Sequence, residues 1–293
     1  MDASFHQAPG NPRTTPHSEP RSLEPEQSRP YRLGVALSGG GARGFAHAGA
    51  LMAIEEAGLK PDVIAGVSAG SVVAVLYSAG IKPLKMADIF DRQGFRDFAE
   101  LSLGRGALFK IDKFRRFILS AIGPDFRNLE DLLIPTYLGV TNLSDGIHAE
   151  FHSGEIGDRM LASCSIPIVF KPIEIDGKLY VDGGVLRNHP AWIIRDLCDT
   201  LIGINVSPLG ADADCRYDSI FEVAMRTYNL MAKANQAADM ALCDVSVCTP
   251  EIASYKVFNL KDINKVFVSG YIHTRRALKD AGLWHPAAIS TNS

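Results

Sequence analysis

Apolar runs and amphipathic stretches alternate along most of the chain, and glycines mark many of the changes between them. Two short apolar runs, at 31–38 and 63–65, are typical of strands that are buried on both faces of a sheet. Each is followed by an apolar segment of helical character, one ending near residue 57 and one covering 71–79. This order of strand and helix predicts an α/β fold with a mainly parallel central sheet.

The same alternation continues toward the C-terminus. A capping box from Ser219 to Glu222 starts a long predicted helix that ends near residue 242, and its methionines favour core packing over an acyl groove. The remaining predicted elements are strands at 134–143, 147–152, 173–176, 179–181 and 200–206, and helices within 83–108 and at 111–122, 155–163, 190–198 and 261–283.

The two ends of the chain differ from its middle. The first 30 residues contain six prolines and no continuous apolar run, so we expect a disordered N-terminal tail without a signal peptide. A single domain is expected over 31–284, with its motifs within 33–206 and a helical C-terminal part at 215–284. A short tail at 285–293 follows.

Composition excludes several classes of function. A formal net charge of −3 gives no overall attraction to nucleic acid. The five cysteines are odd in number and form no C-x-x-C pair, which favours reduced thiols in a cytoplasmic protein and no metal site. Residues 63–81 carry no charge, but their glycines and serines divide them into strand, turn and helix. We therefore do not expect a membrane span there.

Gly66-Val67-Ser68-Ala69-Gly70 places one serine between two glycines, at the spacing of a nucleophile elbow. Such a serine lies on a tight strand-to-helix turn, where close packing leaves little room for side chains at the glycines. The apolar run before the motif and the helical segment after it supply the strand and the helix. Ser68 is therefore the candidate nucleophile.

A second glycine motif, Gly39-Gly40-Gly41-Ala42-Arg43-Gly44, follows the first predicted strand and opens a helix. It satisfies the dinucleotide-binding pattern G-x-G-x-x-G, but the acidic residue that holds the ribose is missing, because the nearby Asp62 precedes the second strand. Consecutive backbone amides at a helix N-terminus also suit an oxyanion. If the first two strands are neighbours in a parallel sheet, the loop lies beside Ser68.

A third motif, Asp182-Gly183-Gly184, places an acid at the end of a predicted strand. Ser68 needs a base, and two kinds are available. Ser68, Asp182 and His189 follow the triad order of α/β-hydrolases, with His273 or His285 as substitutes, but the elbow comes earlier in the chain than in that fold. In the alternative, Asp182 accepts the serine proton directly, with a pKa raised by a low-dielectric site.

Two amphipathic regions have several possible roles. Residues 83–108 predict helices over the mouth of the site, as an ordinary cover or as a lid. In the predicted helix 111–122, the apolar residues share one face and the basic residues lie largely off it, which favours a solvated surface helix and leaves peripheral contact with a membrane as an alternative.

Taken together, the three motifs resemble those of the patatin-like phospholipase family in order and approximate spacing. The resemblance covers about 33–206 and extends to other positions of the chain, namely His47, the run Ala162-Ser163-Cys164-Ser165-Ile166-Pro167, Asn188 and Pro190. It implies a three-layer α/β/α lipid acyl hydrolase that acts on lipid or acyl-ester substrates and needs no cofactor or metal. His47 also has a simpler explanation, as a residue of helix packing.

The resemblance also implies a role for each motif residue. Ser68 attacks the ester, Asp182 acts as the base, and the amides of Gly40 and Gly41 hold the oxyanion with support from Gly39 and Arg43, although Arg43 is equally suited to bracing the loop. The supporting motif positions are Gly44, Gly66, Gly70, Gly183 and Gly184. An acyl transferase on a related serine-based fold and a non-catalytic regulator are the alternatives. The sequence leaves the lipid class and the oligomeric state open.

Overall fold

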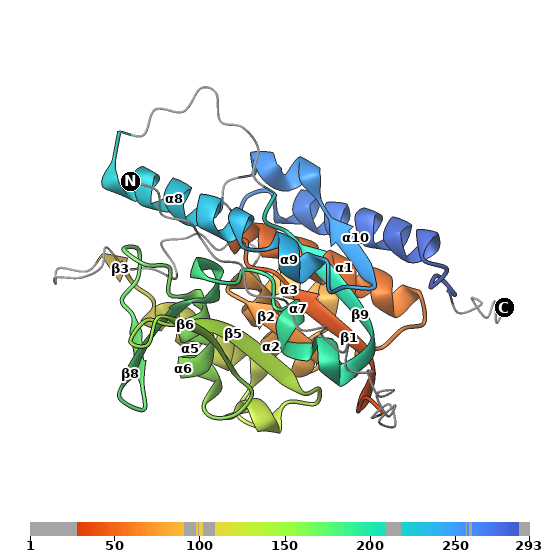
Figure 1. Ribbon diagram of the computed structural model, residues 1–293, viewed down its shortest axis with the longest axis horizontal. Helices are drawn as coiled ribbons and strands as arrows, with labels where there is room; N and C mark the ends of the chain where they lie inside the picture. Colours follow the sequence, from red (N-terminus) through yellow and green to blue (C-terminus); the bar gives the residue numbers. More distant parts are fainter. Residues whose placement is uncertain are drawn as a thin grey trace, which may run out of the picture.

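A computed structural model describes residues 28–90, 98, 100–101, 109–208, 218–255, 257 and 260–286 (Figure 1). Most of the expected N-terminal tail, the last seven residues and much of the predicted cover at 83–108 lie outside these residues. Within the part that the structure describes, no helix combines the length and the apolar character needed to cross a bilayer.

An eight-stranded sheet forms the centre of the molecule, in the order β10-β9-β1-β2-β5-β8-β7, with β6 paired to β5. Neighbours from β10 to β5 are parallel, whereas β6, β7 and β8 join by antiparallel pairing. The strands are β1 (Tyr31–Leu37), β2 (Val63–Val67), β5 (Thr136–Asn142), β6 (Ile147–Phe151), β7 (Ile173–Ile175), β8 (Lys178–Asp182), β9 (Cys198–Asn205) and β10 (Val245–Cys248), and a separate pair consists of β3 (Glu100–Leu101) and β4 (Phe109–Lys110).

Helices cover both faces of the sheet, and the helical layer on one face is larger than the layer on the other. The larger layer includes α1 and α2, and α1 also packs along α10 (Figure 1). The smaller layer centres on α7, which packs against β1, β2 and β9. The helices are α1 (Phe45–Glu56), α2 (Ala69–Ser78), α3 (Pro83–Phe90), α5 (Asp112–Ile122), α6 (Ile156–Cys164), α7 (Ala191–Ile194), α8 (Ile220–Ala234), α9 (Ala237–Met240) and α10 (Ile263–Asp280).

The alternation of side chains along the central strands explains the three layers. In β1, Val35 and Leu37 belong to the large core under α1 and α2, whereas Ala36 faces the smaller core under α7. In β2, Ile64 faces the large core and Val63 the smaller one. Strands that are buried on both faces read as continuous apolar runs, which is why the sequence identifies them. The three-layer α/β architecture with a mainly parallel core is confirmed.

The structure corrects three element predictions. The helix predicted over 219–242 ends at Ala234, because the side chain of Asn235 bonds to carbonyls of the segment after β8, and α9 follows as a separate short helix. The helix predicted over 190–198 is only α7 and a 3₁₀ turn (Arg195–Leu197). The edge strand β10 was not predicted, since its four residues alternate between buried and exposed positions within a polar context.

Candidate active site

Ser68 occupies the sharp turn between β2 and α2, with φ 52° and ψ −121°. A non-glycine residue in this region of backbone space is strained and is held there by its surroundings. The flanking glycines are required by contact: a Cβ on Gly66 would lie 2.4 Å from the carbonyl oxygen of Gly70, and one on Gly70 would lie 2.1 Å from that of Leu37. The motif therefore forms the predicted nucleophile elbow.

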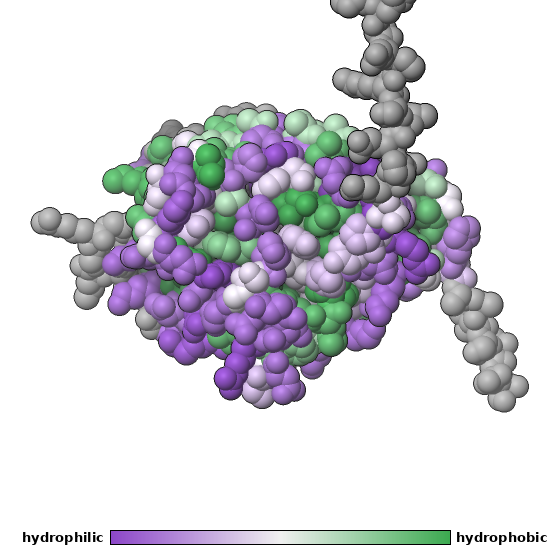
Figure 2. Space-filling model, turned by 60° about the horizontal axis from the view of Figure 1, so that its bottom comes forward, coloured by the Kyte–Doolittle hydropathy of each residue, from purple (hydrophilic) through white to green (hydrophobic). Residues whose placement is uncertain are grey.

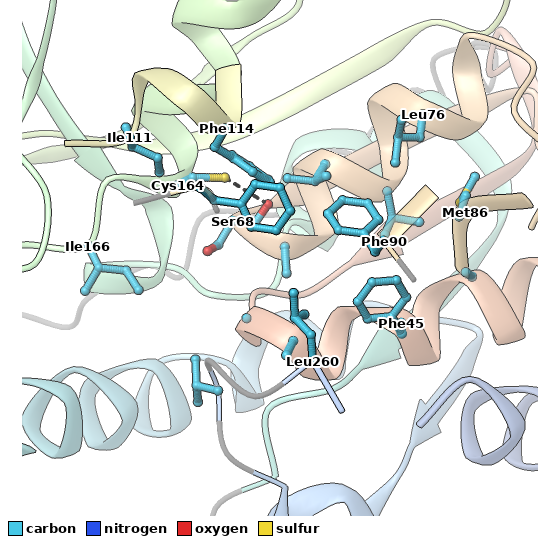
Figure 3. Close-up of a pocket in the computed structure, with 18 of the residues that line it drawn as sticks. Phe45, Ser68, Leu76, Met86, Phe90, Ile111, Phe114, Cys164, Ile166 and Leu260 are labelled. Carbon is cyan, nitrogen blue, oxygen red and sulfur yellow. Dashed lines mark hydrogen bonds between the residues drawn. The ribbon is translucent and has the colours of Figure 1, made fainter. Parts of the chain in front are cut away.

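Side chains from α2 and α6 hold the backbone of the elbow. The Ser68 amide donates a hydrogen bond to Ser163 Oγ at 2.9 Å, and Ser163 Oγ donates in turn to the Gly139 carbonyl at 2.8 Å. The Ser68 carbonyl accepts bonds from Ser71 Oγ at 2.6 Å and Cys164 Sγ at 3.4 Å (Figure 3). The amide and the carbonyl of Ser68 are thus both hydrogen-bonded, and these bonds do not use the side-chain hydroxyl.

Strand register brings Asp182 to Ser68. Val67 aligns with Gly139 on β5, and the next residue of β5, Val140, aligns with Asp182 at the end of β8. Asp182 is fully buried and interacts with the Ser68 hydroxyl. Burial raises the pKa of Asp182 to about 6, because a carboxylate loses its hydration there, whereas hydrogen bonds to the carboxylate act in the opposite direction.

The glycine loop after β1 presents two free amides. The Gly39 carbonyl accepts hydrogen bonds from Ser38 Oγ at 3.0 Å and from Ser207 Oγ at 2.8 Å. Because a trans peptide directs its C=O and N–H in opposite directions, these bonds aim the Gly40 amide away from the two hydroxyls. Among the described residues, neither the Gly40 nor the Gly41 amide has a hydrogen-bond partner. Two free amides can stabilise an oxyanion.

The loop lies against Ser68. A Cβ on Gly39 would lie 3.3 Å from Ser68 Cβ and 2.3 Å from Asn188 Oδ1, so this position has no room for a side chain. The Gly39 amide itself donates to the Asn188 carbonyl at 3.1 Å and is therefore not free for a ligand. Gly39 supports the loop, and the Gly40 and Gly41 amides are its available donors.

Arg43 is a brace of the loop. Its guanidinium donates to the carbonyls of Tyr255 at 2.9 Å and Pro208 at 3.0 Å, and the side chain is buried. These bonds tie the loop to the chain after β9 and β10. Gly44 allows close packing behind the loop, since a Cβ there would lie 2.8 Å from Ala69 Cβ.

The histidines considered as alternative bases have other surroundings. His273 pairs with Glu251 at 2.6 Å, and His285 lies beyond the end of α10. His189 is fully buried, its pKa is lowered to about 3 by burial, and neither ring nitrogen has a partner within the described chain. His47 is buried in α1 with Nε2 bonded to a backbone carbonyl at 2.8 Å. None of these side chains has a hydrogen bond to Ser68 among the described contacts.

An apolar cavity of about 160 Å³ opens beside Ser68. Helices α1, α2, α3 and α5 contribute about half of its lining residues. In Figure 3, the cavity extends past Ser68 toward Ile111 and Ile166 on one side and reaches Met86 on the other. The side chains between Ser68 and Met86 are apolar, and several are aromatic, with Phe45, Phe90 and Phe114 labelled in the view. A hydrocarbon chain whose ester lies at Ser68 fits such a lining.

Several residues that complete the site carry no signal in the sequence. Tyr228 of α8 donates to Asp182 Oδ1 at 2.9 Å, although it lies 46 positions later in the chain. Ser207 bonds to Gly39 across 168 positions. Ser163 lies within a run that resembles the family, but its contact with the Ser68 amide was not predicted. In the described residues, no group of three acidic, histidine or cysteine side chains is placed to hold a metal ion.

Solved structures with low sequence identity are similar in fold to this chain. VipD from Legionella pneumophila has a TM-score of 0.49 and 14% identity, with 86% of this chain and 67% of that chain covered. ExoU from Pseudomonas aeruginosa has a TM-score of 0.39 and 16% identity, with 86% of this chain and 53% of that chain covered.

Sequence relatives include an uncharacterized NTE family protein of Mycobacterium tuberculosis, 30% identical over 230 residues that cover 78% of this chain and 62% of the relative. Lysophospholipase NTE1 of Saccharomyces cerevisiae is 34% identical over 185 residues, which cover 59% of this chain and 11% of that protein. The chain thus spans about three fifths of the mycobacterial relative and a small part of the yeast one. The family model described as Patatin-like phospholipase matches residues 35–194, more than half of the chain. The chain belongs to the patatin-like phospholipase family.

Proposed function

We propose that this protein is a serine hydrolase that cleaves carboxylic esters of lipids through Ser68 and Asp182. The observation that carries the proposal is the position of Ser68, on a strained elbow between a buried carboxylate and an apolar cavity. A pKa of about 6 leaves Asp182 largely ionised at neutral pH and still basic enough to accept a proton in the transition state.

In the first half of the reaction, Ser68 Oγ attacks the ester carbonyl carbon while its proton passes to Asp182. The carbonyl oxygen becomes an oxyanion, which the free amides of Gly40 and Gly41 stabilise. The positive end of α2, whose N-cap is Ser68, favours the same negative charge. Collapse of the intermediate breaks the C–O bond of the leaving group, which takes the proton from Asp182.

The second half releases the acyl group. Asp182 accepts a proton from a water molecule, and the resulting hydroxide attacks the acyl ester on Ser68. The same two amides stabilise the second oxyanion. Breaking the bond to Ser68 Oγ frees the fatty acid, and the proton returns from Asp182 to Ser68. Each group is restored, so no net proton remains on the enzyme.

A lipid with one acyl chain is the proposed substrate. The apolar cavity beside Ser68 has a volume of only about 160 Å³, and the yeast relative carries the name lysophospholipase. Lysophosphatidylcholine and phosphatidylcholine with the same acyl chain separate this proposal from a two-chain substrate. Faster release of fatty acid from the lysophospholipid is expected, and equal or slower release contradicts the one-chain proposal without affecting the serine chemistry.

Peripheral contact with a lipid surface is part of the proposal, and α8 is its proposed site. Ile220, Val223 and Leu230 share one outer side of this helix and are 77%, 49% and 49% exposed, while its inner side reaches Asp182. On the face of the molecule in Figure 2, by contrast, hydrophilic side chains interrupt the hydrophobic areas. Helix α5 is less suited to contact with a bilayer, because its Arg115 forms ion pairs with Asp158 of α6 and with Glu155, the N-cap of α6.

Liposome sedimentation tests the membrane contact. The double variant Ile220→Glu/Val223→Glu is expected to sediment less than the wild type, because charges replace the apolar contact. Arg116→Glu on α5 is the comparison, and it is expected to sediment as the wild type does. Reduced sedimentation of Arg116→Glu alone would transfer the contact to α5.

Labelling of Ser68 by a fluorophosphonate, combined with ester hydrolysis, tests the catalytic proposal. Ser68→Ala and Asp182→Asn are each expected to lose roughly three orders of magnitude or more in kcat, as enzymes do when a nucleophile or its base is removed. Asp176→Asn is the matched control, since Asp176 lies at the other end of the same hairpin and its side chain is 90% exposed.

The outcomes distinguish the candidate functions. Full activity of Asp182→Asn would remove Asp182 as the base. Folded wild-type protein that takes up no label would support the regulator instead of the enzyme. Protein that takes up the label, and that in its unlabelled form passes an acyl group to an alcohol faster than to water, would support the acyl transferase.

A further inference from the structure

Helix α8 brings a tyrosine to the proposed dyad from outside the family match. Tyr228 lies on the inner side of α8, and its Oη donates a hydrogen bond to Asp182 Oδ1 at 2.9 Å. The family model ends at residue 194, whereas α8 begins at Ile220. The tyrosine is buried, so no bulk water competes for this bond.

The bond determines which carboxylate oxygen is left for the serine. Asp182 Oδ1 accepts from Tyr228 and also from the Gly184 amide at 2.8 Å. Asp182 Oδ2 is buried and has no hydrogen-bond partner within the described residues. Because Oδ1 has two donors, Oδ2 is the oxygen available to receive the proton of Ser68.

The turn after β8 is shaped to admit the tyrosine. A Cβ on Gly184 would lie 2.2 Å from Tyr228 Oη, so the hydroxyl reaches the carboxylate only because this residue is glycine. The second glycine of the Asp-Gly-Gly motif thus has a role that the motif alone does not reveal.

The end of α8 is fastened to the same turn. Asn235 Nδ2 donates to the carbonyls of Gly184 at 3.0 Å and Val185 at 3.2 Å, and its Oδ1 accepts from the Asn188 amide at 2.8 Å. These three bonds fix the position of the helix along the segment that follows Asp182. Tyr228, two helical turns before Asn235, is therefore held in register with the carboxylate.

We propose that Tyr228 is a positioning residue of the reaction: its hydroxyl holds Asp182 Oδ1, directs Oδ2 toward Ser68 and stabilises the carboxylate form that accepts the serine proton. This inference rests on the proposed Ser68–Asp182 chemistry. The groups that interact with Tyr228 are Asp182, Cys164 and the Ser68 hydroxyl. Burial and the neighbouring carboxylate raise the pKa of the phenol, whereas the contact with Ser68 acts in the opposite direction, and the phenol stays a donor.

Tyr228→Phe tests the bond while it keeps the ring. Loss of a hydrogen-bond donor to the carboxylate raises the pKa of Asp182. The acid limb of the pH profile, where kcat/KM falls as the pH decreases, is therefore expected to move to higher pH by roughly one unit, equivalent to about 1.4 kcal/mol. The plateau above the limb and KM are expected to change little. Tyr77→Phe is the matched control, because Tyr77 is also buried and also donates to a carboxylate, Glu55, away from the cavity.

A second variant moves the same limb the other way. 3,5-Difluorotyrosine at position 228 is a stronger donor than tyrosine, so the acid limb is expected to shift to lower pH. Near-ultraviolet circular dichroism verifies that both proteins are folded. Opposite shifts in the two variants, without a shift in Tyr77→Phe, support the inference. The inference is overturned if the acid limbs of both Tyr228 variants coincide with that of the wild type. It is also overturned if Tyr77→Phe shifts the acid limb by an equal amount.

The rate of Ser68 labelling by a fluorophosphonate across the same pH range separates this inference from the function on which it rests. Labelling that follows Asp182 in the wild type but is unchanged in both Tyr228 variants refutes the role of Tyr228 alone. Absence of labelling in the folded wild type refutes the proposed function, and the role of Tyr228 with it.

Discussion

The two sides of Ser68 are built in different ways. On its polar side, backbone amides and one carboxylate come from the ends of β1 and β8, where glycines allow distances that a side chain would prevent. On its apolar side, helices α1, α2, α3 and α5 contribute side chains to a cavity that reaches Met86. The polar side depends on atomic positions, and the apolar side on shape and volume.

This difference determines what each side tolerates. A free amide or a carboxylate oxygen acts only within hydrogen-bond distance of its target, so a displacement of one ångström removes its effect. An apolar wall excludes water and accommodates a chain through many weak contacts, so replacing one residue alters the fit only by degrees. Substitutions on the polar side should therefore change the rate for every substrate, and substitutions on the apolar side should change the preference among substrates.

Among substitutions that leave Ser68 and Asp182 in place, the largest effect is expected from Gly41→Ala. Gly41 has φ 59°, and a Cβ would lie 2.2 Å from Val257 Cγ1 and 2.5 Å from the Val257 carbonyl oxygen, which accepts the Ala42 amide. The loop must shift, and loss of an oxyanion donor lowers kcat by about 100-fold to 1000-fold. Steady-state kinetics on a short and a long acyl ester measure the change, which is expected to be equal for both.

Gly146→Ala is the control for Gly41→Ala. Gly146 has a comparable φ of 71°, in the turn between β5 and β6, but a Cβ there meets nothing within 4 Å. It carries the same backbone strain without displacing the loop. Equal losses of kcat in the two variants would attribute the effect to strain and would contradict the role of the loop.

The pH dependence is expected to show the state of Asp182. Only the carboxylate can accept a proton, and burial raises its pKa to about 6, so kcat/KM should fall tenfold per pH unit below about pH 6. The profile should be the same for short and long acyl esters, because the polar side acts on both. A profile that stays flat down to pH 4 would contradict Asp182 as the base.

A smaller loss is expected from Ser163→Ala. Ser163 Oγ accepts the Ser68 amide, so its removal leaves a buried donor without a partner, at a cost of about 1–3 kcal/mol in the free energy of unfolding. A less constrained elbow should lower kcat by about tenfold. Urea denaturation and steady-state kinetics measure the two effects.

Ser165→Ala controls for the loss of a buried serine hydroxyl. Ser165 Oγ donates at 2.7 Å to the Leu161 carbonyl within α6 and does not contact the elbow. Its removal is expected to lower stability and to leave kcat nearly unchanged. If both variants lose kcat equally, the contact with Ser68 is not the cause.

The same difference explains what the sequence could predict. Positions 39, 66 and 70 are glycines because backbone or side-chain atoms occupy the space that a Cβ would fill. Short sequence motifs indicate this requirement. Strands β1 and β2 were predictable because burial on both faces makes them continuously apolar. The proposed nucleophile, its proposed base and the free amides follow from these short segments.

What could not be predicted depends on contacts between distant segments. Tyr228 looks like any core residue of an amphipathic helix, and only the tertiary position of α8 brings its hydroxyl to Asp182. The residues of the cavity wall could not be predicted for the same reason, because in the sequence Phe90 and Met86 look like ordinary core residues. The end of α8 was missed because Asn235 is a tolerable helix residue whose side-chain bonds form only in the folded protein.

The smallest effect, and the only selective one, is expected at the far end of the cavity. Met86 is 1% exposed and lies at the end of the cavity that is away from Ser68 (Figure 3). Met86→Trp fills this end with a rigid ring, so long acyl chains should lose a few-fold in kcat/KM while short chains are unaffected, a difference of about 1 kcal/mol that is typical of one or two methylenes. Leu84→Trp is the control, because Leu84 lies on the same helix α3 with 60% exposure. A series of p-nitrophenyl esters of increasing length measures the optimum. If Met86→Trp lowers the rate for all lengths equally, the cavity does not hold the acyl chain, and the apolar side of Ser68 would then act on the polar side by distorting it.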